Sequence, residues 1–254
     1  MDQPNFDLDG QVVLVTGSSR GIGWDLARQL AGAGATVVAS ARRAADVAAL
    51  VELISADGGA GDAVELDVRD PAAARAAVAA VVARYGRLDV LVNNAGLGTN
   101  HDALDATAAE WDELMAVNVR GLFFVSQAAG RHMVTRGHGR IVNISSQAGT
   151  VGLPRHVAYC ASKGAVDQIT RVLALEWGPH GVTVNAVAPT FVRTPGTADR
   201  LDDPQFSASV LARIPVGHVG TTTDVAAAVI YLASPAGRMV NGAVLAVDGG
   251  WTVQ

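Results

Sequence analysis

Residues 12–23 read VVLVTGSSRGIG, an apolar run followed at once by three closely spaced glycines. The run predicts a buried strand over residues 12–16, and the pattern after the glycines predicts a helix to about residue 32. Glycines between a strand and a helix allow a tight bend and a close approach to a pyrophosphate, which the helix N-terminus attracts. Gly17, Gly21 and Gly23 are spaced as GxxxGxG rather than GxGxxG. The stretch therefore predicts a dinucleotide turn, with an ordinary strand-to-helix turn as the alternative.

The rest of the chain repeats this alternation of short apolar runs and helix-length segments. Further strands are expected at residues 36–40, 63–66, 89–93, 140–145, 182–188 and 243–250. Helices are expected at residues 46–55, from 71 onward, and at 107–136, 157–177, 206–213 and 224–232. Apolar strands that alternate with helices are typical of a parallel sheet covered on both faces, so the fold class is α/β. The alternation of strands and helices stops at residues 190–215, which predicts a substrate loop or lid. The alternative is a segment that only packs against the domain and has no functional role.

The composition argues against several classes of protein. Half of the 254 residues are hydrophobic and 17% are charged, which is typical of a folded globular chain. The net charge of −5 and the lack of an arginine run argue against nucleic-acid binding. No apolar run approaches the roughly 20 residues of a membrane span, and the polar start is no signal peptide, so a cytoplasmic location is expected. The single cysteine fits a reducing compartment, and the six histidines lack ligand spacing, so no metal is expected.

The end of the second expected strand indicates which dinucleotide is bound. NAD sites usually place an acidic residue there to accept hydrogen bonds from the ribose hydroxyls. This chain instead has Ala41, followed by Arg42 and Arg43. Without a carboxylate nothing repels a 2′-phosphate, which Arg42 and Arg20 can bind. NADP(H) is therefore expected, with NAD(H) as the alternative if these arginines are only solvated.

Two further strand ends carry polar residues. Asp67 follows the third expected strand, where its carboxylate can accept a hydrogen bond from the adenine amino group. The run NNAG at residues 93–96 ends the fourth strand, where Gly96 brings the backbone close to the cofactor. For Asn93 two roles stay open, a contact to the cofactor and a brace within the sheet.

Five short motifs follow one another along nearly the whole chain. They are TGSSRGIG at 16–23, NNAG at 93–96, NVRG at 118–121, IVNISS at 141–146 and YCASK at 159–163. In this order and at these separations they resemble the classical short-chain dehydrogenase/reductase (SDR) family. The resemblance implies a single Rossmann-like, doubly wound domain over residues 1–254 with about seven parallel strands, usually as a homotetramer. It also implies that a nicotinamide cofactor exchanges hydride with a small-molecule carbonyl or alcohol substrate.

The resemblance assigns catalytic roles at the matching positions. It implies that Tyr159 is the acid/base and that Lys163 activates it. Ser146 becomes the hydroxyl that orients the carbonyl, and Asn118 becomes the residue that holds a water in the proton relay. These four residues are the expected catalytic set.

The resemblance also extends to the cofactor. The segment PTFVRTP at residues 189–195 matches one that contacts the nicotinamide amide, with Val192 through its backbone and Thr194 through its hydroxyl. The family often has glycine where this chain has Thr190, a departure that can stiffen this loop. The expected cofactor-binding residues are Gly17, Ser19, Arg20, Gly21, Ile22, Gly23, Arg42, Asp67, Val68, Asn94, Ala95, Gly96, Tyr159, Lys163, Pro189, Val192 and Thr194.

Lys163 is the only lysine of the chain and stands four residues after Tyr159. Residues at this spacing share one helix face. A phenol has an ordinary pKa of about 10, and a nearby ammonium favours the phenolate and lowers that pKa. The compact ammonium can also donate to ribose hydroxyls, where a planar guanidinium is a poor substitute. A surface lysine that survived by chance is the alternative.

The neighbours of the catalytic set are interpreted from their positions. Strand alternation points Ser145 and Ser146 to opposite sides, so Ser146 is expected to face the cofactor and Ser145 to be structural. His156 stands three residues before Tyr159 and either lines the pocket or has no special role. Cys160 is expected to pack.

These observations predict an oxidoreductase that transfers hydride between NADP(H) and a carbonyl or alcohol, of the ketone or ketoacyl reductase type. The alternatives are an NAD-dependent alcohol, sugar or polyol dehydrogenase on the same fold, and a non-catalytic Rossmann scaffold. Candidate pocket residues are Gly98, Gln147, Leu153, His156 and the loop 195–206. Their few charges favour a neutral ketone or ketoacyl group over a highly charged acid.

Overall fold

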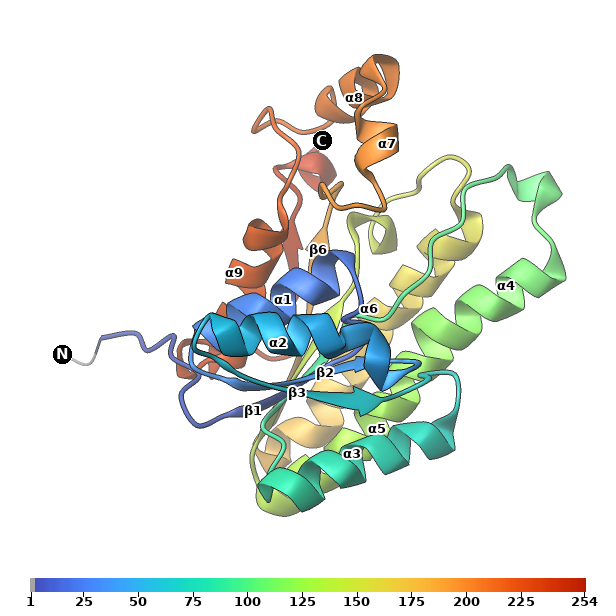
Figure 1. Cartoon of the computed structure of the whole chain (residues 1–254). Coiled ribbons are helices and arrows are strands. Elements are labelled where there is room, and N and C mark those ends of the chain that lie inside the picture. The colour runs from blue at the N-terminus through green and yellow to red at the C-terminus, as the bar shows by residue number, and fades with distance from the viewer. Residues whose placement is uncertain (1–2) are drawn as a thin grey trace.

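The computed structural model describes residues 3–254. Its seven strands form one parallel sheet in the order β3-β2-β1-β4-β5-β6-β7 (Figure 1). The strands are β1 (Val12–Val15), β2 (Thr36–Ala41), β3 (Ala60–Glu65), β4 (Val90–Asn93), β5 (Gly139–Ile144), β6 (Val182–Pro189) and β7 (Val244–Val247). This is the doubly wound α/β fold that the sequence predicts, with the strand order reversing between β1 and β4.

Helices cover both faces of the sheet (Figure 1). On one face lie α1 (Gly21–Gly32), α2 (Ala48–Ala56) and α9 (Thr222–Ala233), packed in one hydrophobic cluster with the strands. On the other face lie α3 (Pro71–Tyr85), α5 (Leu122–Arg136) and α6 (Val157–Trp177), which share a second cluster. The short α4 (Ala108–Met115) packs beside α6.

Strand β1 shows why its sequence is apolar without interruption. Val13 and Val15 point into the cluster under α1, whereas Val12 and Leu14 point into the opposite cluster. Successive strand residues face opposite sides, so a strand covered on both faces buries every side chain. The sheet therefore has no solvated face at β1, and functional groups are confined to its edges.

The helix starts carry the signals that their sequence predicts. Asp70 accepts a hydrogen bond from the N–H of Ala72, with Pro71 in the first turn of α3. Thr107 and Glu110 form a reciprocal capping box at the start of α4. These caps fix where the chain leaves the sheet and turns back.

Three segments differ from the expectations. Strand β3 begins three residues before the expected start at 63. The chain is helical without a break from Ala108 to Arg136, close to the single helix expected over residues 107–136, but a π-helical turn that the sequence did not predict, Ala116–Gly121, lies between α4 and α5. Residues 190–215 contain a short helix that was not expected, α7 (Ala198–Leu201), and the helix expected at 206–213 begins two residues earlier, as α8 (Pro204–Leu211); both lie above the end of β6 in Figure 1.

Within residues 3–254, none of the helices combines the length and the apolarity that crossing a membrane requires. The same residues contain no group of three histidine, cysteine or acidic side chains placed to hold a metal ion.

Candidate active site

The glycine turn between β1 and α1 is shaped to receive a phosphate-bearing ligand. Gly17 and Gly21 have φ angles of 68° and 60°, in the left-handed region that favours glycine. The side chain of Arg20 makes no cap and the first turn of α1 has no acidic residue, so its N–H groups remain available to an anion. A Cβ on Gly21 would meet nothing closer than Thr194, at 3.9 Å. The turn, with Ser19 exposed on it, therefore borders a gap that faces the loop after β6.

Thr16 ties this turn to the end of β4. Its hydroxyl oxygen accepts hydrogen bonds from the N–H groups of Asn94 and Ala95, both at 3.0 Å. The Asn94 amide donates to two carbonyl oxygens of the turn, at 2.9 and 3.0 Å. A Cβ on Gly23 would collide with that amide, and Ile22 packs partly against the core beside it. The ends of β1 and β4 are thus hydrogen-bonded to each other, and their close packing leaves no space for a side chain at position 23.

Two arginines at this edge, Arg20 and Arg42, are exposed, and neither forms an ion pair with any part of the chain described from residue 3 onward. Arg43 differs from its neighbour Arg42, because it binds Asp46 through a 2.6 Å ion pair. Ala41 ends β2 where an NAD site usually carries a carboxylate. The edge therefore presents positive charge without a competing carboxylate from β2.

Asp67 follows β3 and already has a partner. Its carboxylate lies 2.6 Å from the Arg69 guanidinium, whose hydrogen bond holds the pKa of Asp67 below its usual value of 3.8. The adjacent Val68 is buried, and a Cβ on Gly121 would lie 2.9 Å from the carbonyl oxygen of Val68. Gly121 thus lets the start of α5 approach this strand end. The contact of Asp67 with adenine stays a prediction.

Asn93 lies inside the sheet as a brace. Its Nδ2 donates to the hydroxyl of Ser126 and to Oδ1 of Asn143, both at 2.8 Å. Its Oδ1 is buried and has no hydrogen-bond partner within the described chain. These contacts join β4 to β5 and α5. The sequence left two roles open for Asn93, a cofactor contact and a brace within the sheet, and these contacts correspond to the brace.

The two serines after β5 face different partners, as strand alternation predicts. Ser145 donates a 2.5 Å hydrogen bond to Asp167 on α6. Ser146 donates to Oε1 of Gln147 at 2.7 Å and accepts from the N–H of Ala148 at 3.2 Å. The Ser146 hydroxyl therefore stands at the carboxyl edge of the sheet, held by its own turn.

Tyr159 and Lys163 lie one turn apart on α6, as their spacing predicts. The Nζ of Lys163 is 5.7 Å from the centroid of the Tyr159 ring and donates to the carbonyl oxygen of Ile144 at 2.7 Å. Lys163 is only 6% exposed, so its stem fills the space between α6 and the end of β5. This buried ammonium leaves no room for the wide fork of an arginine.

The pKa values of this pair correct one expectation. Burial lowers the pKa of Lys163 from 10.5 to about 8, while nearby Asp167 opposes the change. Burial also raises the pKa of Tyr159 above 10.0, and the adjacent Ser146 hydroxyl offsets this only in part. The sequence predicted a phenol pKa lowered by the ammonium, but Lys163 is not among the groups that shift the pKa of Tyr159, and burial of the phenol dominates.

The π-helical turn places Asn118 beside the loop that follows β4. Asn118 is 1% exposed, accepts from the N–H of Leu97 at 2.8 Å, and donates to the Leu97 carbonyl oxygen at 2.8 Å and to Ser162 at 3.1 Å. A Cβ on Gly96 would lie 3.5 Å from Asn118 Oδ1 and 3.9 Å from Lys163 Nζ. Asn118, Gly96 and Lys163 therefore meet at one place, and π-helical turns often mark such sites.

The loop after β6 closes the other side of the gap. The carbonyl oxygen of Pro189 is 3.5 Å from the Ser146 hydroxyl. Val192 is buried, and its carbonyl oxygen accepts a 2.6 Å hydrogen bond from Thr197. The Oγ1 of Thr190 is buried without a hydrogen-bond partner anywhere in the described chain. A buried hydroxyl without a partner is costly, and the family often has glycine at this position.

Sequence reasoning missed two features of the loop between Ser146 and Tyr159. Arg155 has a φ of 68°, a strained value for a residue other than glycine, and no sequence pattern signalled it. Gln147, proposed only as a pocket residue, contacts Ser146 directly. The sequence carried one signal for this contact, namely that Gln147 directly follows Ser146.

Known proteins match this chain over nearly its whole length. The family model described as enoyl-(acyl carrier protein) reductase matches residues 17–252. D-threitol dehydrogenase of Mycolicibacterium smegmatis is 43% identical over 250 residues, which cover 98% of this chain and 96% of that protein. Galactitol 2-dehydrogenase of Cereibacter sphaeroides is 44% identical, over 98% and 97% of the two chains.

A solved structure agrees with these relatives. A gluconate 5-dehydrogenase from Burkholderia cenocepacia, in complex with NADP and tartrate, superposes with a TM-score of 0.95 at 40% identity. The match covers 99% of this chain and 98% of that one. The chain therefore belongs to the classical short-chain dehydrogenase/reductase family.

Proposed function

We propose that this protein is an NADP(H)-dependent oxidoreductase that interconverts a secondary alcohol and a carbonyl on a sugar- or polyol-type substrate. The observation that carries the proposal is the convergence of Ser146, Tyr159 and Lys163 at one sheet edge, opposite the glycine turn. The Ser146 hydroxyl is close enough to that of Tyr159 for its hydrogen bond to lower the pKa of Tyr159, and the Nζ of Lys163 lies 5.7 Å from the centroid of the Tyr159 ring. A non-catalytic scaffold has no need to keep these groups together.

The chemistry assigns one task to each residue. Bound NADP(H) supplies or accepts the hydride. Tyr159 gives a proton to the carbonyl oxygen during reduction and takes it back during oxidation. Ser146 donates to the same oxygen in a site shielded from water, where negative charge develops.

Lys163 and Asn118 support this proton transfer. The ammonium of Lys163 faces the Tyr159 ring and is free to donate to ribose hydroxyls beside its bond to Ile144. Asn118 lies against Leu97 and Ser162, next to Gly96, where it can hold the water of a relay toward Lys163. A Cβ on Gly96 would lie 3.5 Å from Asn118 Oδ1 and 3.9 Å from Lys163 Nζ, so both polar atoms lie close to the same point, which supports this role.

The residues present fit NADP(H) better than NAD(H). Arg20 and Arg42 flank the glycine turn and the end of β2, and both are exposed. A 2′-phosphate bound there gains charge-assisted hydrogen bonds that NAD(H) cannot make. The solved relative from Burkholderia cenocepacia holds NADP, which supports the same choice here.

The names of the relatives favour a sugar or polyol substrate over the expected ketoacyl group. They include D-threitol, galactitol 2- and gluconate 5-dehydrogenases. A neutral polyol is favoured over an aldonate, because Arg193 is paired with Asp202 at 2.8 Å and Arg200 is stacked on Phe206. These arginines of the loop are thus engaged rather than free to bind a carboxylate.

Residues 190–215 act as the lid of this single cofactor-binding and catalytic domain. Phe191 and Phe206 pack edge to face, with ring centroids 5.5 Å apart. They share a hydrophobic cluster with Val151 and Leu153, which lie on the loop between Ser146 and Tyr159. Movement of α7 and α8 would therefore open the space above the reacting groups.

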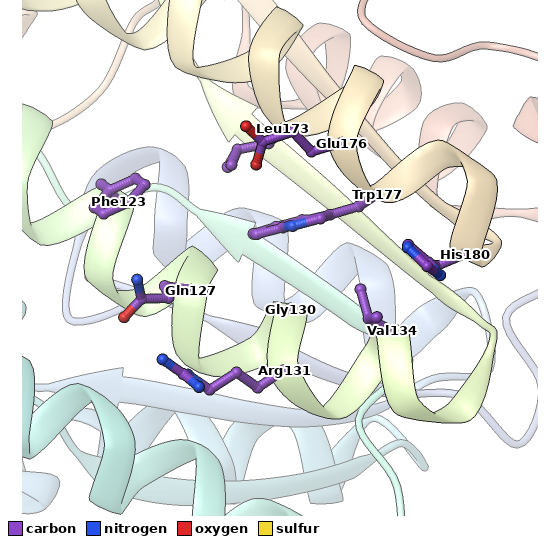
Figure 2. A pocket seen from close by; sticks show the side chains of 9 residues that line it. All are labelled: Phe123, Gln127, Gly130, Arg131, Val134, Leu173, Glu176, Trp177 and His180. Carbon is purple, nitrogen blue, oxygen red and sulfur yellow. The ribbon is translucent and has the colours of Figure 1, made fainter.

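Assembly as a homo-oligomer, with the homotetramer as the expected state, is supported by a groove of about 420 Å³ between α5 and α6 (Figure 2). Trp177 reaches from α6 across Gly130 of α5. Arg131 and Glu176 lie on opposite helices at the groove and form no ion pair within residues 3–254. A second copy related by a two-fold axis can pair these opposite charges, while covering Leu175, which is 78% exposed.

Two measurements test these proposals. NADP⁺ and NAD⁺ are each incubated with D-threitol, galactitol and gluconate, and the reduced cofactor is followed by absorbance. Turnover of a polyol with NADP⁺ is expected, whereas no turnover of any of the three with either cofactor would contradict the function.

Light scattering of the wild type and of Leu175→Arg tests assembly, since the variant is expected to form a smaller species than the wild type. A cytoplasmic site of action fits the free thiol of Cys160.

A further inference from the structure

The loop between Ser146 and Tyr159 holds His156 in a defined orientation at the start of α6. Its Nδ1 lies 2.7 Å from the carbonyl oxygen of Pro154. A carbonyl oxygen only accepts, so Nδ1 must carry the hydrogen. In the neutral imidazole, Nε2 is then left with its lone pair as a hydrogen-bond acceptor.

The ring of His156 lies next to the proposed acid/base. Its centroid is 6.4 Å from that of Tyr159, with the two planes at 66°. His156 is partly buried, and its Nε2 has no hydrogen-bond partner in the described part of the chain. The imidazole beside the Tyr159 ring therefore carries an acceptor that no described protein group satisfies.

The backbone before His156 is strained and tied down. Arg155 adopts a φ of 68°, and its carbonyl oxygen accepts a 3.0 Å hydrogen bond from the N–H of His101. Strain of this kind persists only where the surroundings hold it, and it is commonly found at functional sites. The contact to His101 joins the backbone of this loop to the segment after β4.

Gln147 supplies the complementary group. Its side chain is 4% exposed, and its Oε1 accepts the Ser146 hydroxyl at 2.7 Å. The Nε2 of the same carboxamide donates to no residue that the structure describes. This amide nitrogen is not among the fully buried atoms without a partner, so it stays open to a ligand beside Ser146.

We infer that Gln147 and His156 together recognise a hydroxyl on the carbon next to the reacting one, so that the enzyme acts on vicinal diols and α-hydroxy ketones. A hydroxyl accepts one hydrogen bond and donates another, which matches a donor at Gln147 Nε2 and an acceptor at His156 Nε2. Ser146 and Tyr159 hold the reacting oxygen between them. The inference rests on the proposed function and names the substrate unit of that same site.

A substrate that lacks this hydroxyl leaves both groups unpaired. Sites built to bind a substrate hydroxyl reject analogues that lack it far more strongly than sites that read only shape. The wild type is therefore expected to prefer the hydroxy ketone over the plain ketone by at least tenfold in kcat/KM. Each of the two protein groups contributes to that ratio.

The test compares the reduction of 3-hydroxybutan-2-one and butan-2-one by NADPH. The variant His156→Phe keeps a ring but removes the acceptor, whereas His156→Gln keeps a polar group of similar reach. We expect His156→Phe to reduce the preference about tenfold and His156→Gln to restore part of it. Val157→Ala, at the 45% exposed neighbour, serves as the control and should keep the wild-type ratio.

The outcomes separate this inference from the proposed function. An unchanged preference in His156→Phe overturns the inference, as does an equal loss on both ketones with the affinity for NADPH intact. Failure of the wild type to reduce 3-hydroxybutan-2-one also overturns it, because that ketol carries the whole recognised unit. The proposed function is decided independently by turnover of the larger polyols. NADPH titration of each variant shows whether the fold and the cofactor site are kept.

Discussion

The Nζ of Lys163 donates a 2.7 Å hydrogen bond to the carbonyl oxygen of Ile144, the last residue of β5. This bond fastens the middle of α6 to the edge of the sheet and directs the ammonium toward Tyr159. Because the side chain is 6% exposed, the cation has only this carbonyl and the proposed ribose as partners. The contact explains why an otherwise arginine-only chain keeps a lysine here, since a compact donor on a flexible stem is required.

Replacement of Tyr159 by Phe should abolish proton transfer but leave the cofactor site intact. General acid/base catalysis contributes about 10²–10⁴-fold, so kcat is expected to fall by that factor. The dissociation constant for NADPH, measured by fluorescence titration, should change by no more than about twofold. Tyr231→Phe is the matched control, because that ring lies beside Phe6 and far along the chain from the site. Full activity in Tyr159→Phe would remove the proposed mechanism.

The affinity for NADPH should depend on the protonation of Lys163. Burial places its pKa at about 8, so the residue is a cation below that pH and neutral above it. The charged form is the better donor to ribose hydroxyls, so the dissociation constant should rise as the pH passes through about 8. The increase is limited to about tenfold per pH unit. Lys163→Met should bind more weakly at pH 7 and lose the inflection; an identical inflection in that variant would assign the titration to another group.

Discrimination between the two dinucleotides should depend on Arg42 and not on Arg43. Arg42 is exposed without an ion pair among residues 3–254, whereas Arg43 is held by Asp46 at 2.6 Å. We expect Arg42→Ala to weaken NADPH binding by about tenfold, or 1.4 kcal/mol, and to leave NADH binding unchanged. Arg43→Ala should alter neither. Equal losses in both variants would mean that general positive charge, rather than a specific contact, sets the preference.

Most of the fold follows from local patterns in the sequence. The helix Val157–Trp177 begins and ends where the apolar period and the flanking residues place it. The strands β1, β2, β4, β5 and β6 lie within two residues of the predicted bounds, because fully apolar runs beside glycine turns have few alternatives. The α/β class and the parallel sheet were therefore predictable without knowledge of tertiary contacts.

The features that escape prediction are those set by packing across the chain. The π-helical turn at Asn118 has an ordinary helical sequence, and contacts with Leu97 and Ser162 decide its geometry. The raised pKa of Tyr159 follows from burial, which the spacing to Lys163 does not reveal. The groove between α5 and α6 likewise depends on how Trp177 meets Gly130, two residues far apart in the sequence. The motifs in the sequence identify which chemical groups are present. The burial and the packing around those groups can be read only from the whole structure.

A buried ion cluster at the opposite end of the sheet gives a prediction about stability. Asp89 is fully buried at the side chain and lies 2.6 Å from Arg87 and 3.2 Å from Arg136. Its carboxylate also accepts from the N–H of Val12 at 2.9 Å, which ties the start of β1 to that of β4. Burial favours the neutral acid, but the hydrogen bonds and the two cations outweigh it and hold the pKa of Asp89 below 3.8.

Asp89→Asn should therefore lower the free energy of unfolding by about 2–3 kcal/mol at pH 7, less than a fully buried pair costs because both arginines are partly exposed. A lowered pKa in the folded state stabilises the protein above the unfolded pKa, and this contribution is lost as the pH falls through the folded pKa. The difference in thermal midpoint between the wild type and the variant should thus shrink below about pH 4. Asp57→Asn is the control, because its pair with Arg28 is exposed and should cost less than about 1 kcal/mol. If both substitutions lowered the free energy of unfolding equally at pH 7, the cluster at Asp89 would stabilise the fold no more than an exposed ion pair does.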